Sequence, residues 1–168
     1  MIAVRRLFLA LITIILGLKF SSISKVIHVA LVVRVLLIII GHYIIQLPDS
    51  TKDAIQQEEE AWLIAQSGFF NIFDYYKGPN PRFHSWLIAF PYSLFGRSIL
   101  MAQSISLLLG IGCVILGWKL ANKIWDTNIA KKVAWIIALF PSLVLYSILM
   151  LREVYICFFI LVALIGVV

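Results

Sequence analysis

Long apolar runs separated by short polar connections dominate the chain. Three runs, Val26–Leu47, Ile99–Trp118 and Val133–Leu151, are apolar over nearly their whole length, and Pro141 interrupts the third. A helix that crosses a bilayer needs about 20 mainly apolar residues, so each run is long enough to be a membrane span. A further apolar run occupies residues 154–168. The pattern predicts an all-α fold, a polytopic transmembrane helix bundle that forms a single domain over residues 1–168.

Residues 48–97 differ from the rest of the chain because they are polar and rich in aromatic side chains. A capping box near the start of this segment predicts a helix over Ser50–Ser67, and Gly68 is expected to end that helix. A second segment, Phe83–Phe95, is apolar but too short to cross a bilayer. Its aromatic side chains are typical of a helix that lies at the membrane surface. We therefore expect this loop to contain one helix and one juxtamembrane helix.

Composition and charge agree with a multi-pass membrane protein and predict its orientation. Hydrophobic residues make up 62% of the chain and charged residues 13%, whereas soluble domains are about half apolar and a quarter charged. The net charge of +6 is scattered between apolar runs, which argues against nucleic-acid binding. Four lysines crowd the connection between two runs, whereas six of the eight acidic residues lie in 48–97. The positive-inside rule then predicts 119–132 in the cytoplasm and 48–97 as the first extracytoplasmic loop. The expected location is a plasma (inner) membrane.

Three features of the apolar runs leave alternatives open. The run Leu7–Leu18 is short for a span and is a short span, an interfacial helix or a leader. Arg34 lies inside the run Val26–Leu47, and of its two options, snorkelling toward the cytoplasm is favoured over pointing into the bundle. The chain ends in an apolar run without a polar tail, so we expect the N-terminal part of a longer protein rather than a complete one.

Asp49 is the candidate catalytic residue. The sequence contains no phosphate-binding loop, dinucleotide fingerprint, zinc motif or nucleophile elbow. Asp49 stands immediately before a predicted helix N-terminus, where free amides and the helix dipole stabilise a carboxylate. It is either an ordinary polar residue where the chain leaves the membrane or a general base in a cavity beside the lipid headgroups.

Four further residues are candidates for substrate binding. Arg152 and Glu153 punctuate two apolar runs and form a local ion pair, or else Arg152 holds a lipid-linked phosphate, which a guanidinium suits. His84 is the only histidine of the loop and could contact a phosphate or a headgroup. Tyr76 belongs to a group of aromatic residues that either stack on a sugar or anchor the loop at the interface.

The acidic run Glu58–Glu60 is interpreted as a solvated helix face. Three successive residues spread around a helix and cannot all serve one site. Ile55 and Trp62, seven residues apart, are expected to form the packed face of the same helix.

The order of these elements resembles the N-terminal part of a GT-C fold membrane glycosyltransferase, related to protein O-mannosyltransferases and aminoarabinose transferases. The resemblance covers residues 28–165 and rests on the order and spacing of loose motifs. These are Arg34, Leu47-Pro48-Asp49-Ser50, Ala61 to Gly68, Gly78-Pro79-Asn80-Pro81, Tyr92 to Ser98, Ala138 to Ser142 and Leu151-Arg152-Glu153.

The resemblance implies an enzyme that uses a polyprenyl-phosphate-linked sugar on the extracytoplasmic side of a lipid bilayer. In such families an aspartate at the start of the first outer loop is the catalytic base, and it corresponds here to Asp49. Many relatives carry an acidic residue directly beside it, whereas this chain has Ser50. No cofactor is firmly implied, and this departure leaves a requirement for a divalent metal open.

Two other functions fit the same hydrophobic pattern. The chain could be a small non-enzymatic membrane subunit, or a fragment of a polysaccharide polymerase or flippase. No motif identifies protein partners, the sugar or the acceptor.

Overall fold

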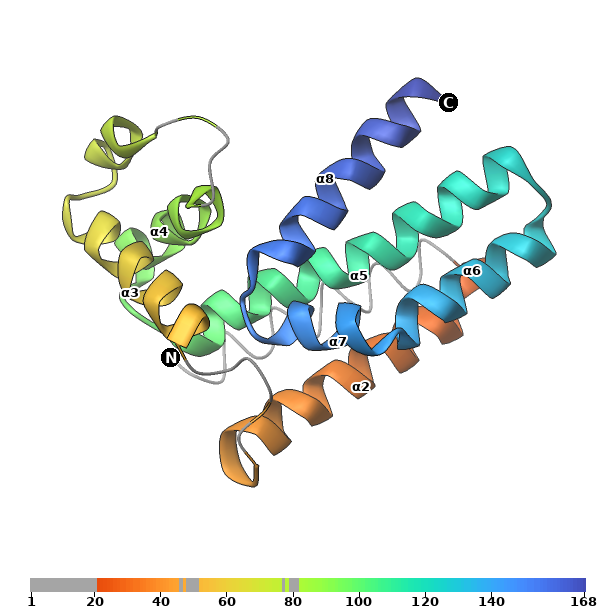
Figure 1. The fold of residues 1–168 in the computed structure, drawn as a ribbon, viewed down its shortest axis with the longest axis horizontal. Helices are drawn as coiled ribbons and strands as arrows, with labels where there is room; N and C mark the ends of the chain where they lie inside the picture. Colours follow the sequence, from red (N-terminus) through yellow and green to blue (C-terminus); the bar gives the residue numbers. More distant parts are fainter. Residues whose placement is uncertain (1–20, 46, 48–51, 77, 79–81) are drawn as a thin grey trace.

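A computed structural model describes residues 21–45, 47, 52–76, 78 and 82–168, and these contain helices but no strands. The all-α prediction is therefore confirmed for this part of the chain (Figure 1). The elements are η1 (Ser21–Ile23), α2 (Ser24–Tyr43), α3 (Lys52–Gln66), η2 (Asn71–Tyr75), α4 (Phe83–Phe95), α5 (Ile99–Ile124), α6 (Thr127–Leu139), α7 (Pro141–Ile148) and α8 (Arg152–Val167).

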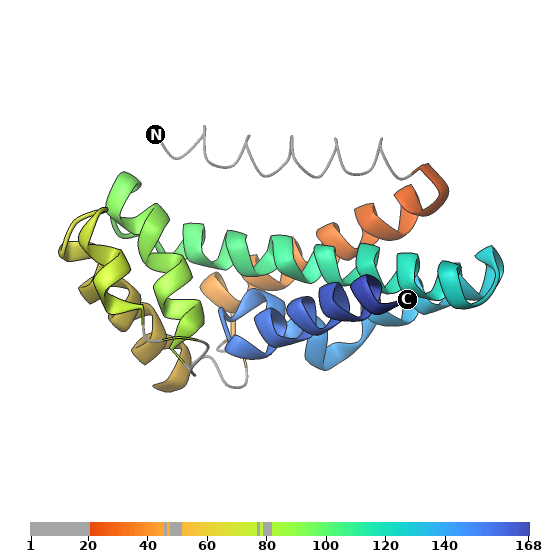
Figure 2. The same ribbon diagram turned by 90° about the horizontal axis from the view of Figure 1, so that it is seen from above.

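The helices α2, α6, α7 and α8 pack around α5, and we call these five helices the helical body (Figures 1 and 2). Of the described helices, α2 and α5 are each long and apolar enough to cross a membrane, and α6 with α7 adds a third span if the two form one. Many large apolar side chains of the body remain exposed, among them Val32, Leu36 and Ile136. Exposed apolar faces on long helices fit contact with a lipid bilayer.

The third predicted span is two helices rather than one. α6 and α7 are bent by 54° relative to each other, and Phe140 between them is extended. Pro141 is the first residue of α7, a position where its missing N–H and fixed φ are tolerated. Because Pro141 has no N–H, it cannot donate the backbone hydrogen bond that would continue α6. Val133–Leu151 therefore does not form a straight helix.

The prediction that Arg34 snorkels toward the cytoplasm is wrong. Its side chain is 0% exposed and lies between helices of the body. Nε donates to Ser147 Oγ at 2.9 Å, and Nη1 donates to the carbonyl oxygens of Ala138 at 3.0 Å and Ala30 at 3.1 Å. The bend explains this arrangement, since a broken helix leaves its last carbonyls without amide partners and carries partial negative charge there. Arg34 thus links α2 to both helices that meet at the bend.

The remaining elements α3, η2 and α4 form a separate group at one end of α5, which we call the end subdomain. In both views α4 lies across the direction of α5 (Figures 1 and 2). The prediction that Phe83–Phe95 is a separate short helix is confirmed, and so is the helix after residue 50, which is described from Lys52. Gly68, at φ +94°, follows the end of α3 as predicted. The proposed cap Ser50 and the run Leu7–Leu18 lie outside the described residues.

The packed face of α3 differs from the prediction. Its buried residues Ala54, Glu58, Ala61 and Ala65 recur at helical spacing, whereas Ile55 is 55% exposed and so was wrongly assigned. Trp62 is half-buried and its ring contacts that of Tyr92. Small alanines let α3 approach α4 closely, so the buried stripe is set by small side chains and not by the larger Ile55.

The end of the body opposite the end subdomain carries the turn between α5 and α6 (Figure 1). Asp126 caps α6 by accepting hydrogen bonds from the backbone N–H groups of Asn128 and Ile129 at 2.7 and 2.8 Å. This is the end where the four lysines cluster: Lys119, Lys123, Lys131 and Lys132. The basic connection and the end subdomain thus lie at opposite ends of α5.

Candidate functional site

Arg152 and Glu153 form the first turn of α8, at the end of the body that faces the end subdomain. The chain reverses just before them through Met150, whose φ of 59° is the only positive value among the described non-glycine residues. Arg152 Nε lies 3.5 Å from Glu153 Oε1, and the two side chains are 49% and 42% exposed. Such an exposed pair contributes little to stability, so the guanidinium keeps surface on which a further anion can bind.

The predicted site residue His84 is buried in the contact between α4 and α8. Its side chain is 2% exposed, its Nε2 lies 3.4 Å from Ser85 Oγ, and its ring centroid is 5.7 Å from that of Tyr155. Tyr155 is in turn hydrogen-bonded to Ser106 of α5, with 3.1 Å between the hydroxyl oxygens. The structure therefore places His84 beside Tyr155, which lies about one helical turn after Arg152 in α8.

Tyr76 contacts α4 through Phe83 and Trp86. It is half exposed, and its ring centroid is 4.9 Å from that of Trp86. Together they line a groove of about 270 Å³ between α3 and the start of α4. Its other walls include Glu60, Tyr75, Arg82 and Phe83. The residues that line this groove do not include Arg152, Glu153 or His84.

Asp49, the candidate base, lies outside the described residues. Leu47, two residues before it, and Ala54, five residues after it, belong to one apolar cluster with Leu149 and Leu151. Leu151 directly precedes Arg152. Both flanks of Asp49 thus contact the segment that leads into α8.

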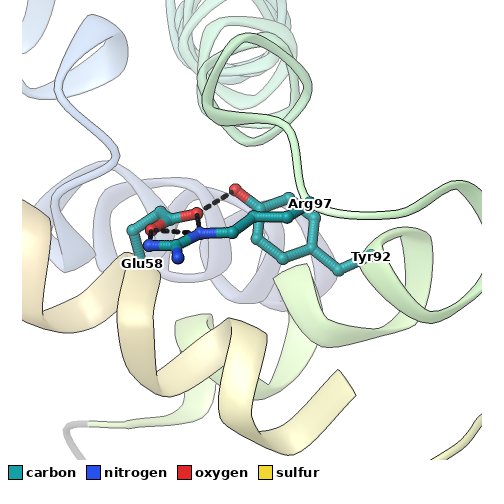
Figure 3. A network of polar contacts seen from close by, with 3 residues as sticks. All are labelled: Glu58, Tyr92 and Arg97. Carbon is teal, nitrogen blue, oxygen red and sulfur yellow. Dashed lines mark hydrogen bonds and ion pairs between the residues drawn. The ribbon is translucent and has the colours of Figure 1, made fainter. Parts of the chain in front are cut away.

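A buried polar network joins α3 to the end of α4, and sequence reasoning missed it. Glu58 is 3% exposed, so the interpretation of Glu58 as part of a solvated face is wrong. Its Oε1 accepts from the Tyr92 hydroxyl at 2.8 Å, and its Oε2 accepts from Arg97 Nη2 at 2.6 Å (Figure 3). A usable signal was present, because Glu58 shares one helical face with three alanines.

The network shifts the pKa values of its members. Burial, followed by the hydrogen bond to Glu58, raises the pKa of the Tyr92 hydroxyl. The hydrogen bonds to Glu58 raise the pKa of Arg97, whose charged form they stabilise. At neutral pH Tyr92 therefore stays a donor and Arg97 a cation, and both stabilise the carboxylate of Glu58.

Among the described residues, no three His, Cys, Asp or Glu side chains gather as a metal-binding group. The described part of the chain is all-helical, with two membrane-length apolar helices and a small helical subdomain at one end. Comparison of the chain with protein-family models, with curated proteins and with solved structures finds no match.

Proposed function

We propose that the chain is part of a GT-C-type membrane glycosyltransferase that transfers a sugar from a polyprenyl-phosphate-linked donor to an acceptor on the extracytoplasmic side. The proposal includes a polytopic arrangement in the plasma membrane, with residues 48–97 outside. One observation carries it: both flanks of Asp49 pack against the segment that leads into Arg152. This contact supports a shared site in which a carboxylate and a guanidinium serve the same reaction.

In the proposed reaction Asp49 accepts the proton of an acceptor hydroxyl. The hydroxyl oxygen forms a bond to the anomeric carbon, while the bond from that carbon to the phosphate oxygen breaks. The electron pair leaves with the polyprenyl phosphate, whose negative charge Arg152 stabilises. A guanidinium presents planar paired donors to phosphate oxygens, and the weak contact of Arg152 with Glu153 at 3.5 Å is easily replaced.

Two substitutions test this chemistry in the complete protein, in membranes supplied with a radiolabelled lipid-linked sugar. Asp49→Asn is expected to lower kcat by about 10²–10⁴-fold, because a positioned general base contributes that much. Arg152→Ala is expected to raise the KM for the donor, and Arg152→Lys to restore part of the loss. Asp53→Asn is the matched control, since Asp53 is an exposed carboxylate close by in α3. Wild-type transfer by Asp49→Asn would show that the base is wrongly assigned.

The orientation has its own test, which follows from the opposite charge of the two ends. Gln56 on α3 and Asn122 near the end of α5 are both exposed, so each accepts a cysteine without loss of packing. We expect an impermeant thiol reagent to label Gln56→Cys in intact cells and Asn122→Cys only after lysis. The reverse pattern contradicts the orientation while leaving the fold untouched.

A further inference from the structure

The groove between α3 and the start of α4 has a rigid aromatic wall. Trp86 Nε1 donates to the carbonyl oxygen of Ile72 at 2.9 Å, which fixes the indole. Phe83 stacks on Trp86, with 5.7 Å between the ring centroids and 23° between the ring planes. The Tyr76 ring packs against the same indole, and about half of the Tyr76 surface is exposed. A wall held in this way loses little conformational freedom when a ligand binds.

Polar groups stand at the edge of this wall. Glu60 Oε1 lies 3.2 Å from Arg82 Nε, with side chains 25% and 74% exposed, and the two tyrosines of the groove add hydroxyl groups. The volume of about 270 Å³ is just below the range of about 300–1,000 Å³ for pockets that bind drug-sized ligands. The groove therefore suits a ligand with an apolar face, several hydrogen-bonding groups and the size of one ring.

Charge decides between ligands of that size. The pairing of Glu60 with Arg82 balances the charge at the edge of the groove, so no net positive charge there favours an anionic ligand over a neutral one. A saccharide is neutral, presents C–H groups on one face and carries hydroxyls that donate to carboxylates and accept from guanidinium groups. By contrast, Phe70 is 83% exposed and lies outside the groove. It offers a ligand only an apolar surface.

We propose that this groove binds one residue of a neutral glycan, and that this glycan is the acceptor of the proposed transfer. The assignment of the glycan as acceptor rests on the proposed function, whereas the binding itself does not. Tyr76 and Trp86 contact the apolar face of the sugar, and Glu60 and Arg82 bind its hydroxyls.

The test measures binding of three neutral tetrasaccharides, built from mannose, glucose or arabinose, to the whole chain in detergent micelles by saturation-transfer NMR. At least one is expected to bind saturably. Tyr76→Ala is expected to weaken that binding about five- to tenfold, as for the loss of an aromatic contact, and Glu60→Gln is expected to weaken it as well. Phe70→Ala, an exposed aromatic outside the groove, is the control and should change the affinity less than about twofold.

Several results overturn the proposal. Absence of binding for all three tetrasaccharides does so, and so does an equal effect of Phe70→Ala and Tyr76→Ala. If vesicles of phosphatidylglycerol bind in a Tyr76-dependent manner while no tetrasaccharide binds, the groove holds a lipid headgroup instead.

The outcome is distinguishable from that for the proposed function. Asp49→Asn should bind the tetrasaccharide as tightly as the wild type. If the tetrasaccharide binds in a Tyr76-dependent manner but the complete protein transfers no sugar, the proposed glycosyltransferase function is refuted and glycan binding in the groove stands. If the complete protein transfers sugar in an Asp49-dependent manner but binds no tetrasaccharide, the proposed function stands and glycan binding in the groove is refuted.

Discussion

Two arginines, one in the helical body and one beside the end subdomain, are held in contrasting ways. Arg34 is fully buried, and its hydrogen bonds go to a hydroxyl and two carbonyl oxygens, all uncharged. Arg97 keeps 43% of its side chain exposed and pairs with the buried carboxylate of Glu58 (Figure 3). The buried ion in the helical body is therefore the Arg34 cation, whereas the buried ion in the end subdomain is the Glu58 anion.

The difference shows how each region accommodates a buried charge. In the body the broken end of α6 supplies carbonyl oxygens that an intact helix would already have paired, and a guanidinium has enough donors to use several of them. In the end subdomain the carboxylate of Glu58 is stabilised by the Arg97 guanidinium and by the Tyr92 hydroxyl. A buried charge without such partners would cost several kcal/mol.

The largest effect in this comparison is expected from Arg34→Ala. It opens a cavity and leaves the carbonyl of Ala138 without its donor, so the free energy of unfolding should fall by about 3 kcal/mol. Arg34→Met separates the effect of the cavity from that of the lost hydrogen bonds, because methionine fills most of the space of arginine but has no N–H donors. The control is Leu36→Ala, a truncation on the exposed side of α2. Equal losses for Arg34→Ala and Leu36→Ala, measured by unfolding in mixed micelles, would contradict the role of Arg34 at the bend.

A smaller effect is expected from Glu58→Ala, and it should remain within the end subdomain. The Tyr92 hydroxyl is then left buried without an acceptor, which costs about 2 kcal/mol. Hydrogen exchange should rise along α3 while the amides of α5 stay protected. Glu59→Ala provides the comparison, since Glu59 is the exposed neighbour. If α5 loses protection as well, the two regions are one cooperative unit and the contrast between them fails.

The smallest effect is expected from Tyr92→Phe, about 1 kcal/mol for one hydrogen bond. Because the pKa of Tyr92 is raised in the folded protein, its proton is held more tightly there than in the unfolded chain. The stabilisation is thus fully present below the ordinary tyrosine pKa of about 10 and is lost as the pH rises above it. The stability difference between wild type and Tyr92→Phe should therefore shrink above about pH 10. A difference that stays constant to higher pH would remove Tyr92 from the network.

Much of the fold followed from local patterns in the sequence. Apolar runs of membrane length located α2 and α5, and the short run Phe83–Phe95 was correctly separated from the spans. Gly68 was identified as a helix stop because a left-handed conformation there favours glycine. Each of these predictions depends on residues close together in the chain, whose periodicity and conformational preferences act locally.

The candidate site was only partly accessible in this way. The sequence indicated Arg152 and Tyr76 as binding residues. Only the packing of the helices shows that Arg152 lies in the exposed first turn of α8 and that Tyr76 lines the aromatic groove. Glu58 differs locally from Glu59 and Glu60 only in sharing a helical face with three alanines, and its partners Tyr92 and Arg97 are distant in the sequence.

What the sequence determined by itself is an all-helical chain with membrane-length apolar helices and one polar, aromatic loop, because hydrophobic length and period express themselves within each segment. Only the tertiary structure decided the burial of Arg34 and the partners of Glu58. Each of these depends on which backbone and side-chain groups from distant segments satisfy one another once water is excluded, and such pairings are set by packing between helices.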